Sequence, residues 1–298
     1  MGALEAGWGA VDDDESVRAV QAAVAAGVTF FDTAANYGAG HSERVLGRAV
    51  AENRAGALLA TKFGYELDEA GRVVRGVDAG PEAVRRSCEA SLRRLGTDYL
   101  DLFQFHVGDF PPDQVEGVLE TLEALVAEGN IRAYGWSTDD PERAERFAAG
   151  THCVSVQHQL NVLEDNPAML TLCEQKGLAS INRGPLAMGL LTGKYAAGAD
   201  FEATDVRRSS PDWLKYFRNG QPDPEWLGRL EAVREVLTSG GRTLAQGALA
   251  WLWARSPATL PIPGFRTVRQ VEENAGALAY GPLTPAQMAE VERLLGRE

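Results

Sequence analysis

The regular alternation of short apolar strands with capped helices is the feature that most limits how this chain can fold. Runs rich in β-branched and aromatic residues favour buried strands, and the stretches between them have helical apolar spacing. Such alternation is typical of parallel strands joined by right-handed crossovers. It predicts an α/β fold, a (β/α)8 TIM barrel, with a doubly wound sheet as the alternative. The predicted strands span residues 28–31, 57–61, 99–105, 131–136, 153–156, 178–181 and 259–262.

Two regions fit this alternation less well. Only residues 3–9 remain for a first barrel strand, and two glycines interrupt them. The long stretch 184–224 contains no clear strand, although the chain after it is rich in helical patterns. The doubly wound alternative is disfavoured because no Gly-x-Gly-x-x-Gly turn is complete: Gly38-Ala39-Gly40 is followed by His-Ser-Glu.

Composition restricts the kind of partner that the protein can have. The 298 residues, 45% of them hydrophobic, suit one barrel domain over residues 1–298. A net charge of -13 argues against general binding to nucleic acid or to an anionic membrane. With no membrane-length apolar run and no signal peptide, we expect a cytoplasmic protein that acts on a small molecule. The three cysteines are widely spaced, and His152, Cys153 and His158 match no zinc pattern, so no metal is expected.

Polar residues recur where the predicted strands end. In a barrel these ends share one rim, where active sites are built, so the side chains are expected to converge on one pocket. Each residue alone has a structural explanation, such as a turn residue, a rim cation or a hydrogen-bonded strand-end histidine. Their arrival on successive strands favours a site. The residues are Asp32, Lys62, His106, Ser137, Gln157 and Arg183.

The types of these residues fit proton transfer to a carbonyl oxygen. Asp32 and Lys62 on neighbouring strands are expected to form a partly buried ion pair. A phenol titrates near about pH 10, and a neighbouring ammonium makes it a stronger acid, so Tyr37 fits the role of general acid. His106 fits the role of orienting the same oxygen. A hydrolase with paired carboxylates is disfavoured because only Asp32 is well placed.

The sequence resembles the aldo-keto reductase family over nearly its whole length. The segments FDTAANYG, TKFG and DLFQFH carry, in order, the family's catalytic Asp32 and Tyr37, Lys62 and His106. The resemblance implies NADPH-dependent reduction of an aldehyde or ketone, with Tyr37 as proton donor. A nicotinamide-binding regulatory or scaffolding subunit with little turnover is the alternative, since some relatives act in that way.

The resemblance also extends to the cofactor segments. Ser137 and Gln157 match contacts to the nicotinamide carboxamide, and Arg183 stands where many members place an aromatic residue that stacks on the ring. Arg266 before a helix favours NADPH over NADH, whereas Gln270 has an alternative role as a helix cap with Thr267. In GPLAMGLLTGKY the expected pyrophosphate contacts are Pro185, Leu186, Met188, Gly189, Leu191 and Lys194; in IPGFRTVRQVEEN the adenosine-phosphate contacts are Gly264, Arg266, Gln270, Glu273 and Asn274.

The amino terminus departs from the family pattern. Members usually begin with a hairpin that plugs the barrel floor, and this chain is expected to lack the hairpin and part of strand one. Substrate choice is expected to depend on Trp8, on the loop from Phe63 to Asp78 and on the stretch around Trp213, Tyr216 and Phe217. Aromatic residues in a long loop also serve as packing anchors, so both roles remain open for that stretch. The substrate and the oligomeric state are not readable from the sequence.

Overall fold

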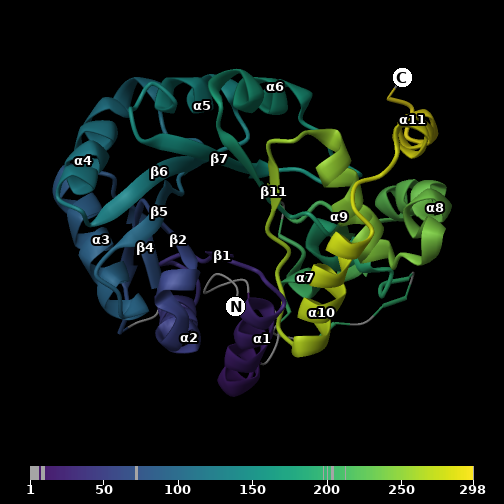
Figure 1. Cartoon of the computed structure of the whole chain (residues 1–298), viewed down its shortest axis with the longest axis horizontal. Helices are drawn as coiled ribbons and strands as arrows, with labels where there is room; N and C mark the ends of the chain where they lie inside the picture. The colour runs from purple at the N-terminus through teal and green to yellow at the C-terminus, as the bar shows by residue number, and fades with distance from the viewer. Residues whose placement is uncertain are drawn as a thin grey trace.

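The computed structural model describes residue 7 and residues 11–70, 73–196, 198–199, 201–202, 205–211 and 213–297. Over this part of the chain, seven strands pair in parallel in the order β1-β2-β5-β6-β7-β8-β11. The sheet curls on itself, with helices α3 to α6 on its outer side (Figure 1). Because the strand order follows the chain without a reversal, the barrel prediction is confirmed and the doubly wound alternative is excluded.

The elements alternate along the chain as the sequence predicts. Strands of the parallel sheet are β1 (Phe30–Asp32), β2 (Leu58–Phe63), β5 (Leu100–Phe105), β6 (Ile131–Ser137), β7 (Cys153–Gln159), β8 (Ala179–Arg183) and β11 (Thr259–Pro261). Helices are α1 (Asp13–Ala25), α2 (His41–Val50), α3 (Pro81–Leu95), α4 (Glu116–Ala127), α5 (Pro141–Phe147), α6 (Pro167–Lys176), α7 (Val206–Ser209), α8 (Pro224–Thr238), α9 (Leu244–Arg255), α10 (Val268–Gly276) and α11 (Pro285–Leu294). Short 3-10 helices are η1 (Ala51–Gly56), η2 (Pro112–Gln114), η3 (Ala187–Thr192), η4 (Ser239–Gly241) and η5 (Ala277–Ala279).

Two antiparallel hairpins correct the sequence prediction. The expected loop from Phe63 to Asp78 contains β3 (Tyr65–Asp68) paired with β4 (Val73–Val77), and the stretch 184–224 contains β9 (Phe217–Arg218) paired with β10 (Gln221–Pro222). Every residue of β4 is exposed, so the strand lacks the alternation that marks a half-buried one. The second hairpin has only two residues on each strand, too few to form a pattern.

The sheet ends at β1 and β11, and the helical layer spans the interval between them. Helix α1 packs against both α2 and α10, and the carboxylate of Glu15 accepts a hydrogen bond from the Val268 N–H at 3.3 Å. The predicted first strand, residues 3–9, and the expected loss of the hairpin fall outside the described residues except at Gly7. The Gly7 carbonyl accepts from the Val206 N–H at 2.8 Å.

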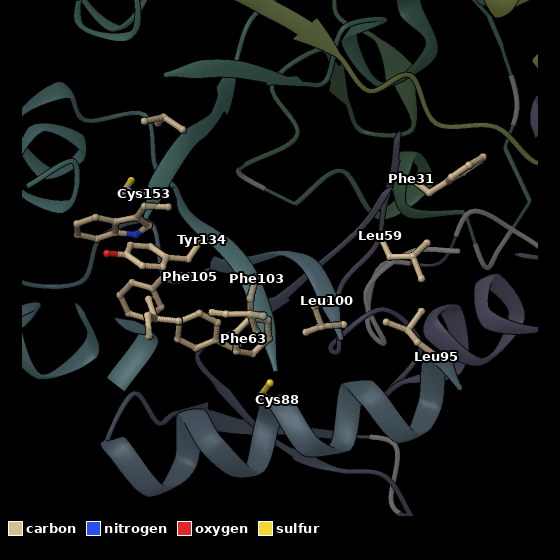
Figure 2. Close-up of a cluster of buried hydrophobic side chains, with 14 of the residues drawn as sticks. Phe31, Leu59, Phe63, Cys88, Leu95, Leu100, Phe103, Phe105, Tyr134 and Cys153 are labelled. Carbon is tan, nitrogen blue, oxygen red and sulfur yellow. The ribbon is translucent and has the colours of Figure 1, made fainter. Parts of the chain in front are cut away.

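Aromatic side chains fill the layer between the sheet and the helices. The Phe63 ring stacks on those of Phe103 and Phe105, with centroids 4.4 and 5.3 Å apart (Figure 2). Since successive strand residues point to opposite faces, this outward packing turns Lys62 and Gln104 toward the barrel interior.

Candidate active site

A buried ion pair forms the base of the site. The side chain of Lys62 is fully buried, and its ammonium pairs with the Asp32 carboxylate and donates to the Thr33 carbonyl oxygen at 2.7 Å. Burial disfavours the charged ammonium, but the Asp32 carboxylate and the Tyr37 oxygen outweigh it, so the pKa of Lys62 is raised above its ordinary value. Lys62 is therefore a fixed cation on the inner face of the sheet.

Tyr37 and His106 meet above this ion pair. The turn after β1 brings the Tyr37 ring to 5.1 Å from the Lys62 Nζ, and the Tyr37 oxygen helps to raise the pKa of the ammonium. The Tyr37 and His106 rings lie edge to face with centroids 6.0 Å apart, and Tyr65 from β3 approaches His106 in the same way at 5.9 Å. The structure thus brings together all four residues of the expected tetrad, and adds Tyr65 from the hairpin.

His106 is held neutral. Burial, the Lys62 ammonium and the Arg183 guanidinium keep the pKa of its imidazole well below the usual range. A neutral imidazole has one nitrogen that donates a hydrogen bond and one that accepts, so His106 can donate to an oxygen without giving up a proton.

Two glutamines complete the surroundings of Asp32. Its second carboxylate oxygen accepts from the Nε2 atoms of Gln104 at 2.8 Å and Gln157 at 2.9 Å. Gln157 Nε2 also donates to the Gln104 side-chain oxygen at 3.1 Å. Sequence reasoning missed Gln104, although a polar residue two positions before His106 in an apolar strand shares its face. The sequence predicts that Gln157 contacts the nicotinamide carboxamide. In this structure its amide nitrogen donates to the Asp32 carboxylate.

Ser137 and Arg183 lie on the rim beside this cluster, in one pocket of about 400 Å³. Its other lining residues come from the segments after β5 and β6, among them Asp109 and Asp139. The Arg183 guanidinium pairs with Asp139 and donates to the Gln159 side-chain oxygen at 3.2 Å. The Ser137 hydroxyl and the Arg183 guanidinium, which Asp139 and Gln159 hold, therefore line the same pocket.

The expected pyrophosphate loop has an unusual backbone. Ala187, Met188 and Gly189 have φ values of 48°, 55° and 96°, in the left-handed region that side chains other than glycine rarely adopt. The N–H groups of Gly189 and Leu191, expected to meet phosphates, both donate to the Leu186 carbonyl. Pro185 is buried, whereas Lys194 is exposed.

The segment around Arg266 starts helix α10. Thr267 is its N-cap and accepts from the Gln270 N–H at 3.3 Å, while the Gln270 side-chain oxygen accepts from the Arg266 N–H at 2.7 Å. The Gln270 side chain therefore supports the start of the helix through the residue before the N-cap, and its expected contact with the cofactor stays a prediction. Gly264 is exposed, Glu273 and Asn274 are half-buried, and the Glu273 carbonyl accepts from the Gln246 side chain at 3.1 Å.

The three segments expected to determine substrate specificity differ in where the structure places their aromatic residues. Tyr65, in the segment from Phe63 to Asp78, lies against His106. Tyr216 and Phe217 are each 2% exposed and belong to the core, so the packing role holds for them, whereas Trp213 is exposed. Trp8 lies outside the described residues.

Two features are absent from the described residues. No helix there is long and apolar enough to cross a membrane. No group of three or more histidine, cysteine, aspartate or glutamate side chains there is arranged to hold a metal ion.

The fold and the site define a class: a barrel protein with a lysine-paired tyrosine and a neutral histidine at the carboxyl end of its strands. The chain matches the model of the aldo/keto reductase family over residues 1–295. It belongs to that family of NAD(P)H oxidoreductases, as the sequence predicts.

Individual relatives agree with the family assignment. The aldo-keto reductase str7 of Strobilurus tenacellus is 32% identical over 295 residues, 96% of this chain and 83% of that protein. The aldo-keto reductase yakc [NADP(+)] of Schizosaccharomyces pombe is 31% identical over 97% of this chain and 84% of its own. The solved glycerol dehydrogenase AKR11B4 from Gluconobacter oxydans superposes with a TM-score of 0.83 at 30% identity, covering 99% of this chain and 89% of that one. An aldo/keto reductase from Klebsiella pneumoniae, solved with NADP and acetate, has a TM-score of 0.73 at 28% identity, covering 100% of this chain and 91% of that one.

Proposed function

We propose that the protein reduces an aldehyde or ketone to the alcohol with NADPH, and that Tyr37 is the general acid. The observation that carries this proposal is the buried Lys62 ammonium joined to Asp32 and Tyr37 beside a neutral His106. A cation that holds a phenol within reach of a reacting oxygen has a direct use in proton transfer to that oxygen.

The residues present fit a nicotinamide dinucleotide. The Ser137 hydroxyl and the Arg183 guanidinium line one pocket, the left-handed turn at residues 187–189 is a strained backbone of the kind that clusters at ligand sites, and Arg266 precedes a helix N-terminus. NADPH is favoured because the Klebsiella pneumoniae relative was solved with NADP and also with NADPH, and because yakc carries NADP(+) in its name.

The geometry supports one role for each residue of the site. A bound reduced nicotinamide supplies the hydride. His106 donates a hydrogen bond to the carbonyl oxygen and orients it. Tyr37 delivers a proton to that oxygen as negative charge develops there, and the Lys62 ammonium stabilises the phenolate that remains. Asp32, held by Gln104 and Gln157, keeps the ammonium in place.

Replacement of the Tyr37 hydroxyl tests the proposal. We expect Tyr37→Phe to lower carbonyl reduction by about 10²- to 10⁴-fold, the usual contribution of a positioned acid. The affinity for NADPH, measured by fluorescence titration, should stay nearly unchanged. Tyr65→Phe is the matched control, because Tyr65 also lies edge-on to His106, and it should cost much less activity.

The outcomes separate the candidate functions. Equal loss of reduction and of NADPH affinity in Tyr37→Phe would count against Tyr37 as the acid. Tight NADPH binding by the unaltered protein, with no turnover of any carbonyl, would favour the regulatory subunit. The carbonyl compounds tested as substrates should include small hydroxylated aldehydes and ketones, since the rim pocket is lined by charged side chains and a structural relative is a glycerol dehydrogenase.

A further inference from the structure

A buried polar cluster behind the rim has no part in the proposed chemistry. Its centre is the Tyr216 hydroxyl, on a side chain that is 2% exposed. This oxygen accepts hydrogen bonds from Gln159 Nε2 at 2.6 Å and Asn161 Nδ2 at 2.8 Å, and donates its proton to the Glu164 carboxylate. A phenolic oxygen has one proton to donate and room to accept, so its hydrogen-bonding capacity is well used here.

The cluster is connected to the expected cofactor segments through its two amides. Because Gln159 gives its nitrogen to Tyr216, its oxygen faces the rim and accepts from the Arg183 guanidinium at 3.2 Å. Asn161 gives one N–H to Tyr216 and the other to the carbonyl oxygen of Gly184 at 3.0 Å. The turn with the left-handed backbone begins three residues after Gly184, at Ala187.

Only a residue without a side chain fits at position 184, where the backbone passes close to Gln159. Gly184 has a φ of +61°, and a Cβ atom there would lie 2.6 Å from the Gln159 side-chain oxygen, closer than real Cβ atoms approach. On its other side, Arg183 pairs with Asp139, whose carboxylate also accepts from the Gln159 backbone N–H at 2.7 Å. Gln159 therefore holds the guanidinium directly with its amide and indirectly through Asp139.

We propose that Tyr216 is a positioning residue for the cofactor: through Gln159 and Asn161, its hydroxyl holds the Arg183 guanidinium and the Gly184 carbonyl where the nicotinamide half of the dinucleotide binds. The proposal rests on the proposed binding of NADPH. Without the hydroxyl, the Gln159 amide nitrogen keeps only the Glu164 carboxylate, at 3.5 Å, which fixes its orientation less firmly. The Gln159 side-chain oxygen is then fixed less firmly where it accepts from the Arg183 guanidinium, and Arg183 loses part of its positioning.

The protein contains a matched control for this test. Tyr134 is also fully buried, and its hydroxyl also hydrogen-bonds to a glutamate, Glu123. It lies on the outer side of the sheet among the aromatic residues of Figure 2. Tyr134→Phe and Tyr216→Phe therefore remove the same chemical group from two buried sites, of which one adjoins the rim.

The experiment compares both variants with the unaltered protein by NADPH titration, thermal unfolding and steady-state kinetics. Both variants should melt at a lower temperature. Tyr216→Phe should raise the Kd for NADPH about tenfold, as expected when a charged binding group loses its pre-organisation, and Tyr134→Phe should leave it within about twofold. At saturating NADPH, kcat of Tyr216→Phe should stay within about threefold, so the effect falls on KM for the cofactor. An unchanged Kd in Tyr216→Phe, or an equal increase in Tyr134→Phe, would overturn the proposal.

A second variant tests the route through Gln159. Gln159→Leu should weaken NADPH binding about as much as Tyr216→Phe, and the double variant should bind no more weakly than Gln159→Leu, because the hydroxyl acts through that amide. Losses that multiply in the double variant would contradict this route. Gln159→Leu also gives a reading if Tyr216→Phe does not fold.

A crystal structure of Tyr216→Phe without ligand separates this proposal from the proposed function. If the unaltered protein does not bind NADPH, the proposed function fails, yet the crystal structure still reports on the cluster. Loss of the contact between Arg183 and Gln159 supports the positioning role. A retained contact refutes it.

Discussion

At the scale of single residues, the ion pair at the base of the site is costly by itself and is kept because every charge has partners. Burying an ion costs several kcal/mol, and removing one partner of a buried pair costs about 3–5 kcal/mol. The Asp32 carboxylate has Lys62 and two glutamine amides, and the Lys62 ammonium has Asp32, a carbonyl oxygen and Tyr37. Such a fully partnered cluster fixes the position of the phenol above it.

The buried histidine on β7 gives a prediction about pH. His158 is fully buried, contacts the Ser180 hydroxyl at 2.7 Å, and burial lowers its pKa from 6.5 to about 4. Between these two values the unfolded chain binds a proton that the folded protein excludes, so stability is retained above pH 6.5 and lost as the pH falls toward 4. The loss from this group is about 1.4 kcal/mol for each pH unit. The free energy of unfolding of His158→Gln, measured with urea, should therefore fall less steeply between pH 6.5 and pH 5 than that of the unaltered protein. The same dependence on pH in both proteins would refute this role of His158.

At the scale of elements, helix contacts depend on glycines at close approaches. A Cβ atom on Gly247 of α9 would lie 2.1 Å from the Leu237 carbonyl oxygen of α8, whereas one on Gly228 of α8 would meet nothing within 4 Å. The two glycines therefore have opposite roles, although both lie inside helices that pack on each other.

Alanine substitutions should separate these roles. Gly247→Ala should destabilise the protein by about 1–3 kcal/mol, because the helices must move apart. Gly228→Ala should stabilise it by up to about 1 kcal/mol, since alanine has the higher helix propensity. Chemical denaturation measures both changes. If Gly247→Ala is as stable as the unaltered protein, the close packing of α8 and α9 is not as described.

Most elements could be predicted from local patterns, and the missed ones have physical reasons. The strands from Leu100 to Phe105 and from Ile131 to Ser137 are mostly apolar and mostly buried, the expected pattern for strands covered on both faces. Strand β4 is exposed throughout and is held by pairing with β3, a contact that no local pattern reveals.

At the scale of the whole molecule, the proposed cofactor site draws on segments far apart in the chain. Ser137 is on β6, the left-handed turn follows β8, and Arg266 precedes α10. A ligand that bridges such segments stabilises the entire folded state by mass action, by about 2.7 kcal/mol at a concentration one hundred times its Kd.

Thermal unfolding with added cofactor should report the preference for NADPH. We expect NADPH to raise Tm more than NADH at equal concentration, because Arg266 at a helix N-terminus can meet the 2′-phosphate. Arg266→Ala should remove most of the difference between the two cofactors. Arg269→Ala, which removes an exposed arginine three residues further along, should preserve it. Equal shifts from NADPH and NADH in the unaltered protein would refute the preference.

Local patterns in the chain were enough to identify the parallel barrel and the side chains on its rim, because strand periodicity and the residue at each strand end are properties of neighbouring residues. They could not show which partners those side chains would choose. Gln104 and Gln157 meet on Asp32, and Tyr216 reaches Gln159 from a distant loop, because curvature of the sheet and packing of the helices bring these residues together. Such contacts depend on the folded arrangement in space, and the separation of two residues in the sequence does not reveal them.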